Sequence, residues 1–161
     1  MNSIYDCYTL NNGMKIPCMG FGTYKAVDFK TAIEAGYRYF VSASLYYTEE
    51  GLGQAIKDSG IPREEFFIVS KMWTDQMGYE NVKVALEESL AKLQMDYLDI
   101  YLIHWPRCSD NYDEWKSITA DTWKAMEELQ KEGKIRALGF SNFLPHPLYL
   151  LLLLDHDNSM S

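Results

Sequence analysis

Cysteines, basic residues and long apolar runs are all scarce in this sequence, and each scarcity excludes a class of protein. Its three cysteines, Cys7, Cys18 and Cys108, have no metal-site spacing, so we expect a reduced, cytoplasmic protein without a bound metal. Lys and Arg number 15 against 23 acidic residues, and the net charge of −8 argues against nucleic-acid or anionic-membrane partners. The longest apolar run, 148–154, is too short for a membrane-spanning helix, which needs about 20 residues.

Three further features are missing. The N-terminus has no basic stretch followed by an apolar one, so no signal peptide is expected. No glycine-rich phosphate loop opens a helix, which argues against a Rossmann-type dinucleotide site. No linker or low-complexity tract divides the 161 residues, of which 47% are apolar. We therefore expect one domain over residues 1–161.

Three apolar runs of strand length each lead to a side chain that can hold or move a proton. These are Tyr37–Ala43 before Tyr46, Phe66–Met72 with Lys71, and Tyr97–Trp105 with His104. They recur roughly every 30 residues, the length of a strand, a crossover helix and two loops. Because the carboxyl ends of parallel strands meet at one rim, we expect the phenol, ammonium and imidazole to converge. A nearby cation lowers the pKa of a phenol from about 10, as general acid catalysis requires.

The chain reads as alternating strands and helices after a hairpin around Asn12-Gly13. We expect a first strand at 19–23 and a short first helix that Asp28 caps. Later helices are expected at 80–93 and from about Asp121 to Gly133, with a fifth strand at 135–142. Five parallel strands and four crossover helices predict an α/β fold, a partial (β/α)8 TIM-type barrel of about five βα units.

Several segments carry a family resemblance. They are NNGMKIPCMGFGT at 11–23, GYRYFVSASLYYTEEGLG at 36–53, SKMW at 70–73, YLIHWP at 101–106 and GFSNF at 139–143. In order and spacing they resemble the aldo-keto reductases, over residues 5 to about 148. The resemblance implies an oxidoreductase that reduces aldehydes or ketones to alcohols. Its implied cofactor is NADP(H), with NAD(H) as the alternative, and its implied partner is a small carbonyl substrate.

In that family a Tyr, a Lys, a His and an Asp surround the substrate carbonyl. The resemblance makes Tyr46 the proton donor, Lys71 its activator and His104 the orienting group. It also places Trp73 and Trp105 in the substrate pocket.

The resemblance assigns four further residues to the cofactor. Ser141 and Asn142 resemble the residues that hold the nicotinamide carboxamide, which needs a paired donor and acceptor. Thr23 and Tyr24 resemble positions beside the nicotinamide ribose. In the family, the adenine, 2′-phosphate and pyrophosphate are bound by segments after the fifth strand, which these 161 residues do not include.

Val41 stands where the family pattern has the Asp. A carboxylate there would pair with Lys71 and keep it charged beside Tyr46. Without that carboxylate a buried lysine loses charge as its pKa falls, and the expected loss in rate is about 10²- to 10⁴-fold. Tyr47 replaces the family's usual glycine, and a bulky residue there is strained if its φ is positive.

These departures favour an impaired enzyme, and we expect Val41→Asp alone not to restore activity in this chain. Two alternatives are a non-catalytic binding protein of the same fold and a half-barrel that must associate to function. Open edges at the first and fifth strands, together with the leucine run 150–154, favour self-association.

Overall fold

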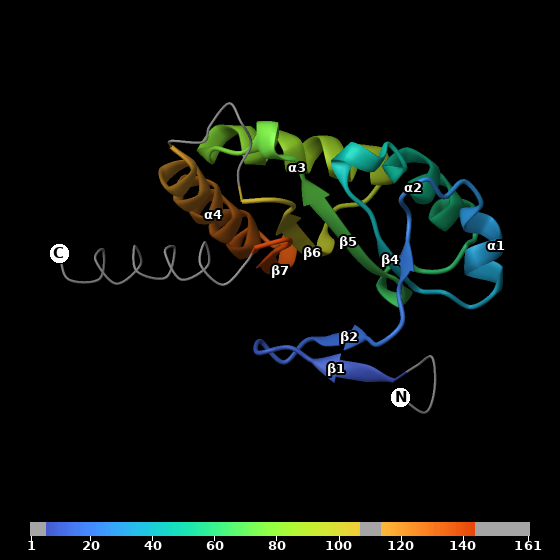
Figure 1. Cartoon of the computed structure of the whole chain (residues 1–161). Helices are drawn as coiled ribbons and strands as arrows, with labels where there is room; N and C mark the ends of the chain where they lie inside the picture. Colours follow the sequence, from blue (N-terminus) through green and yellow to red (C-terminus); the bar gives the residue numbers. More distant parts are fainter. Residues whose placement is uncertain (1–5, 107–113, 144–161) are drawn as a thin grey trace.

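The computed structural model describes residues 6–106 and 114–143. The chain opens with an antiparallel hairpin of β1 (Cys7–Thr9) and β2 (Lys15–Pro17). At its turn the side chain of Asn12 accepts a hydrogen bond from the Met14 backbone N–H at 3.0 Å, and Gly13 has a φ of 83°. The hairpin is the one that the sequence predicts, and Figure 1 shows it standing apart from the helices.

A parallel five-stranded sheet forms the body of the protein. Its strands are β3 (Phe21–Gly22), β4 (Tyr39–Val41), β5 (Phe67–Met72), β6 (Leu98–Ile103) and β7 (Ile135–Phe140), paired in chain order. The helices that connect them are α1 (Phe29–Glu34), α2 (Glu49–Asp58), α3 (Tyr79–Leu93) and α4 (Trp115–Lys131). All four helices lie on the same side of the sheet (Figure 1), as crossovers of one hand require. The predicted partial (β/α) barrel with an N-terminal hairpin is confirmed.

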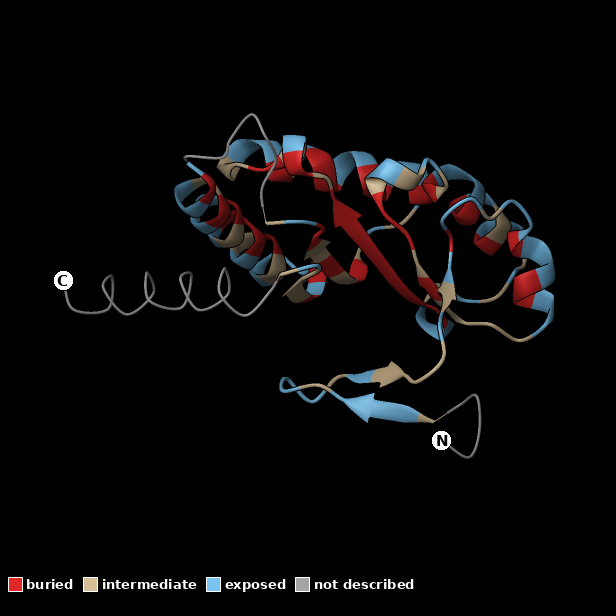
Figure 2. Cartoon of the chain, in the orientation of Figure 1, coloured by how far each residue is buried: buried red, intermediate tan, exposed pale blue. Residues whose placement is uncertain are grey.

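The core lies between the sheet and the helices. Along β5, Ile68 and Met72 point into this core, whereas Lys71 points to the opposite face. Figure 2 shows β5 and the inward sides of the helices as buried, and the hairpin as mostly exposed. The end of β5 that carries Lys71 therefore packs against the core on its opposite face.

The first helix is as short as predicted. Asp28 caps it, because its carboxylate accepts hydrogen bonds from the Thr31 backbone N–H at 3.0 Å and the Thr31 hydroxyl at 2.8 Å. Phe29, Ala32 and Ile33 are its buried residues. One turn and a half of helix thus suffices for this crossover.

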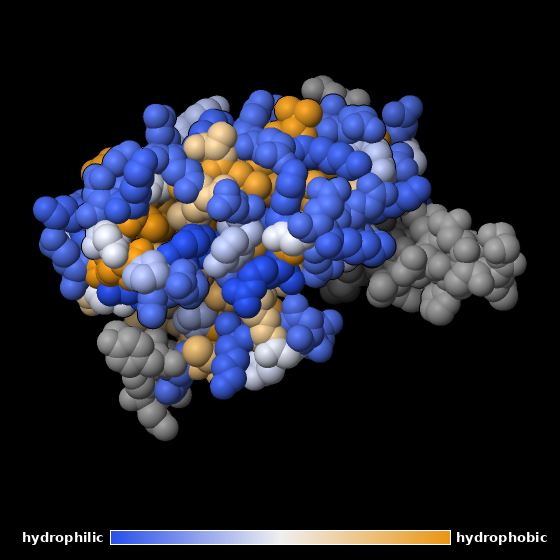
Figure 3. All heavy atoms as spheres, turned by 180° about the vertical axis from the view of Figure 1, so that it is seen from behind, coloured by the Kyte–Doolittle hydropathy of each residue, from blue (hydrophilic) through white to orange (hydrophobic). Residues whose placement is uncertain are grey.

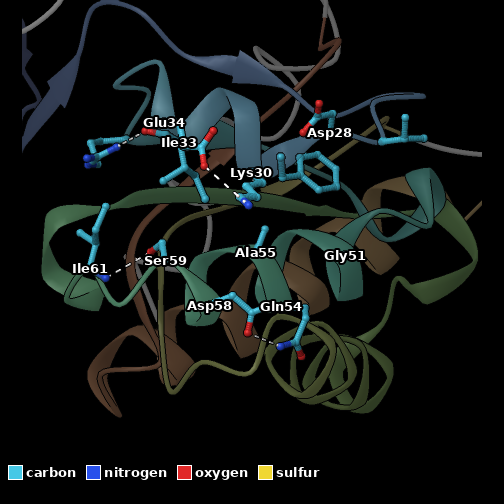
Figure 4. A pocket seen from close by; sticks show the side chains of 13 residues that line it. Asp28, Lys30, Ile33, Glu34, Gly51, Gln54, Ala55, Asp58, Ser59 and Ile61 are labelled. Carbon is cyan, nitrogen blue, oxygen red and sulfur yellow. Dashed lines mark hydrogen bonds and ion pairs between the residues drawn. The ribbon is translucent and has the colours of Figure 1, made fainter.

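An open groove of about 720 Å³ lies between α1 and α2. Figure 4 shows its two flanks: Lys30 pairs with Glu34 at 3.8 Å on α1, and Gln54 donates to Asp58 at 2.7 Å on α2. None of the sequence-predicted site residues lines this groove. It is distinct from the rim where the strands end.

Three predicted elements have wrong boundaries. The first strand is Phe21–Gly22 rather than 19–23. Helix α4 begins at Trp115 rather than near Asp121, because Trp115 and Thr119 are buried and continue the inward face of the helix by one more turn and a half. Strand β7 ends at Phe140, so Ser141 and Asn142 lie beyond it.

The rear face of the protein is mostly hydrophilic, with hydrophobic atoms showing between the charged side chains (Figure 3). The leucine run 150–154 lies outside the described residues. Within the described part, no helix has the length and apolarity needed to cross a membrane.

Candidate active site

Tyr46 is positioned by the turn that follows β4. The 3-10 turn η1 (Ser44–Tyr46) is held from the neighbouring unit, because the Ser44 hydroxyl donates to the side-chain oxygen of Gln76 at 2.7 Å. The next residue, Tyr47, has a φ of 56° and is 88% exposed, so it adopts the positive φ that a glycine accepts more easily. The half-buried Tyr46 ring then points back towards β5.

Lys71 lies at the end of β5 and is 6% exposed. Its Nζ donates to the Ser42 backbone carbonyl at 2.9 Å and to the Tyr46 hydroxyl at 3.3 Å. It also lies 4.8 Å from the centroid of the Tyr46 ring. The Tyr46 hydroxyl accepts from Lys71, and its own proton is left to donate elsewhere.

Val41 lies on the same sheet face as Lys71. It pairs in register with Val69, two residues before Lys71 on the adjacent strand. In the described part of the chain, no carboxylate forms an ion pair with Lys71. Burial lowers the pKa of Lys71 from 10.5 to about 8, the direction expected for a buried lysine without an acidic partner.

The pKa of Tyr46 is shifted away from that of an efficient acid. Burial, followed by the neighbouring Tyr24, raises it above the ordinary value of 10.0. Because the pKa of Lys71 is about 8, most of its ammonium is still charged at pH 7, so the sequence-based expectation of a lost charge holds only in part. The ammonium of Lys71 loses its proton as the pH rises through about 8.

His104 completes the cluster. It follows β6, is 7% exposed, and its ring centroid lies 5.6 Å from that of Tyr46 and 5.2 Å from that of Trp73. Burial, followed by the charge of Lys71, lowers the pKa of His104 to about 4, so the imidazole is neutral at pH 7. Its Nδ1 is buried and has no hydrogen-bond partner among the described residues.

Ser141 and Asn142, which follow β7, lie beside His104 at the end of the neighbouring strand. The Asn142 side-chain N–H donates to the His104 backbone carbonyl at 2.8 Å and to the Ser141 hydroxyl oxygen at 3.1 Å. In the described part of the chain, the Asn142 amide oxygen accepts no hydrogen bond, and the residue is exposed. An exposed acceptor beside a hydroxyl donor fits a primary carboxamide such as that of nicotinamide.

The remaining predicted residues divide into exposed and buried ones. Tyr24 and Trp105 are 61% and 44% exposed, and the Tyr24 ring lies 5.1 Å from that of Tyr46. Thr23 is fully buried, and its hydroxyl contacts the Ser42 hydroxyl at 3.0 Å and the Thr48 hydroxyl at 2.8 Å. Because the Thr23 hydroxyl already has these two hydrogen-bond partners, Tyr24 is the one of the two predicted residues whose side chain is free to contact a ribose.

Two supporting residues were missed by sequence reasoning. Glu49 reads as an ordinary acidic residue of a first helical turn, yet it is 1% exposed and accepts from the Ser70 hydroxyl at 2.6 Å. Gln76 holds η1 through Ser44 and also accepts from the Trp73 backbone N–H at 2.8 Å. Glu49 contacts a residue 21 positions away, and Gln76 lies in a 3-10 turn. No periodic pattern in the sequence marks either residue.

Comparisons with known proteins give a consistent result. A family model described as the aldo/keto reductase family matches residues 23–155. The chain is 47% identical over 157 residues to glyoxal reductase from Bacillus subtilis, covering 93% of this chain and 54% of that protein. It is 44% identical to 9,11-endoperoxide prostaglandin H2 reductase from Trypanosoma cruzi, covering 92% and 52%. The chain thus spans about half the length of the curated relatives it matches.

Solved structures agree. An aldo/keto reductase from Brucella melitensis superposes with a TM-score of 0.84 at 38% identity, covering 92% of this chain and 58% of that one. MGS-M4, an aldo-keto reductase enzyme from a Medee basin deep-sea metagenome library, gives a TM-score of 0.83 at 41% identity, covering 91% and 53%.

Proposed function

The chain belongs to the aldo/keto reductase family, and we propose that its site reduces small aldehydes and ketones to alcohols, weakened by Val41. The observation that carries the proposal is the 3.3 Å contact between Lys71 Nζ and the Tyr46 hydroxyl. Support for small aldehydes comes from relatives whose names are glyoxal reductase and, at 42% identity, aldehyde reductase of Saccharomyces cerevisiae. NADP(H), or alternatively NAD(H), would supply the hydride.

In this proposal each residue has one task. Tyr46 gives its hydroxyl proton to the carbonyl oxygen, and the charged fraction of Lys71 stabilises the phenolate that remains. The neutral His104 orients the carbonyl oxygen with a ring N–H. Ser141 and Asn142 would hold the carboxamide of the cofactor, on the exposed acceptor and hydroxyl described above.

The test adds the second half of a relative, because the chain spans about half the length of that protein. Residues 1–143 are joined to the second half of the Bacillus subtilis glyoxal reductase, and NADPH oxidation is followed with glyoxal and propanal. We expect slow turnover that Tyr46→Phe lowers by about 10²-fold, because the general acid is removed. Circular dichroism and the intact relative serve as controls for folding and assay. Equal turnover of the Tyr46→Phe variant would contradict the proposed role.

One structural observation supports the half-barrel alternative, in which copies of the chain must associate. In the described part of the sheet, β3 and β7 each pair on one side only. Such edges present unpaired N–H and C=O groups that can pair with another chain.

We therefore expect the 161-residue chain to form dimers or larger species. Size exclusion coupled to light scattering should give a mass above 18.7 kDa. Salt near 0.5 M should not disperse these species, since backbone pairing is not screened as exposed charges are. A single folded species at the monomer mass would refute association.

A further inference from the structure

The hydrogen bonds around Lys71 can satisfy its neutral amine form as well as the ammonium ion. Its Nζ has two acceptors, the Ser42 carbonyl and the Tyr46 hydroxyl. An ammonium has three N–H donors, and besides these two acceptors its partner in the described part of the chain is the face of the Tyr46 ring, 4.8 Å from Nζ. A neutral amine has two N–H donors, both satisfied here, and one lone pair that remains unused.

The surroundings of Lys71 also hold little negative charge. The titratable groups that face it are Tyr46 from η1 and His104 beyond β6, with Tyr24 behind Tyr46. Burial raises the pKa of the Tyr46 phenol and keeps His104 neutral at pH 7, so neither is an anion there. Val41, which shares the sheet face of Lys71 on the adjacent strand, is apolar. A lysine in such a setting deprotonates far more readily than one on the surface.

We propose that Lys71 is a nucleophilic amine that condenses with short aldehydes to form a covalent imine, an activity separate from hydride transfer. The geometry places its nitrogen 3.3 Å from the Tyr46 hydroxyl, a phenol that can give a proton to the carbonyl oxygen. The proposal needs no cofactor, so it stands or falls independently of the reductase function.

The step balances without any further reagent. Nζ attacks the carbonyl carbon and forms a C–N bond, while the Tyr46 hydroxyl gives its proton to the carbonyl oxygen. The nitrogen returns one proton to Tyr46, which yields a carbinolamine. A second proton transfer through Tyr46 releases water and leaves the C=N bond, so that one aldehyde and one amine give one imine and one water.

Access limits the reaction to short aldehydes. Lys71 is only 6% exposed, whereas Tyr46 is half-buried. A carbonyl compound must therefore approach Nζ from the side of the Tyr46 hydroxyl. Trp73 and His104 pack edge to face at 5.2 Å beside this path. An unbranched aliphatic aldehyde can reach Nζ here with less displacement of these rings than a bulky aromatic one.

The test traps the imine with propanal and cyanoborohydride near neutral pH, using the chain without cofactor. Peptide mapping compares propylation of Lys71 with that of Lys30, whose side chain is 82% exposed. Burial lowers the pKa of Lys71 from 10.5 to about 8, which enlarges its neutral fraction near pH 7 by about 10²-fold. We expect its labelling to exceed that of Lys30 by at least about tenfold. Equal or slower labelling of Lys71 would overturn the proposal.

A matched pair of variants tests the cause. Val41→Asp should lower the Lys71 to Lys30 labelling ratio by about tenfold or more, because a carboxylate holds the proton on Nζ. Val41→Asn introduces a side chain of nearly the same shape as Asp but without its charge, and it should keep the labelling ratio of the native chain. In the native chain the labelling rate of Lys71 should level off above about pH 8. A Val41→Asp chain that labels like the native one would refute the role of the missing carboxylate.

Discussion

Val41→Asp, placed in the protein that joins residues 1–143 to the second half of glyoxal reductase, is expected to raise the rate of aldehyde reduction by about 10²- to 10⁴-fold. Position 41 lies on the sheet face of Lys71, one strand away. A carboxylate there raises the pKa of Lys71 from about 8 and keeps the ammonium charged. The charged ammonium stabilises the phenolate of Tyr46 and so makes it a stronger acid.

The pH profile separates this electrostatic cause from a change in packing. With Val41, activity should fall as pH rises through about 8, because the required charged form of Lys71 is lost there. In the Val41→Asp variant the fall should move to higher pH. Val41→Asn is the matched control and should keep the native rate and profile. An increase in rate for Val41→Asn as large as that for Val41→Asp would show that charge is not the cause.

Asp99→Ala is expected to lower the free energy of unfolding by about 3–5 kcal/mol. Asp99 is fully buried on β6, and its carboxylate accepts from Arg63 at 2.9 Å and from Arg136 at 2.8 Å. It also accepts from the Ile68 backbone N–H at 2.8 Å. Removing it takes the same carboxylate acceptor from two guanidinium groups and a strand N–H, on three different segments of the chain, although Arg63 keeps the Phe66 and Tyr97 carbonyls as acceptors.

The measurement is urea unfolding followed by circular dichroism. Asp96→Ala is the control, because Asp96 is exposed three residues away and its loss should change stability by less than about 0.5 kcal/mol. Asp99→Asn should fall between the two, since its amide oxygen keeps one acceptor for these donors. A loss below about 1 kcal/mol for Asp99→Ala would show that the Arg63 and Arg136 contacts contribute little.

The amino-acid sequence by itself determined the local elements and the rim of the site. Short-range patterns sufficed for the hairpin around Gly13, for the cap at Asp28 and for the strands that end beside Tyr46, Lys71 and His104. Each depends on residues a few positions apart, or on the rule that parallel strands end at one edge. The family follows from motifs in order, and the catalytic roles of these three residues remain predictions.

Only the tertiary structure decided which groups meet and which charges are balanced. Asp99 meets Arg63 and Arg136 across 36 and 37 residues of sequence, and Glu49 meets Ser70 across 21. Such pairs depend on the register of neighbouring strands and on how deeply a helix packs, neither of which a local pattern carries. The same holds for Lys71, because its pKa is set by burial and by the acceptors that the fold places around Nζ.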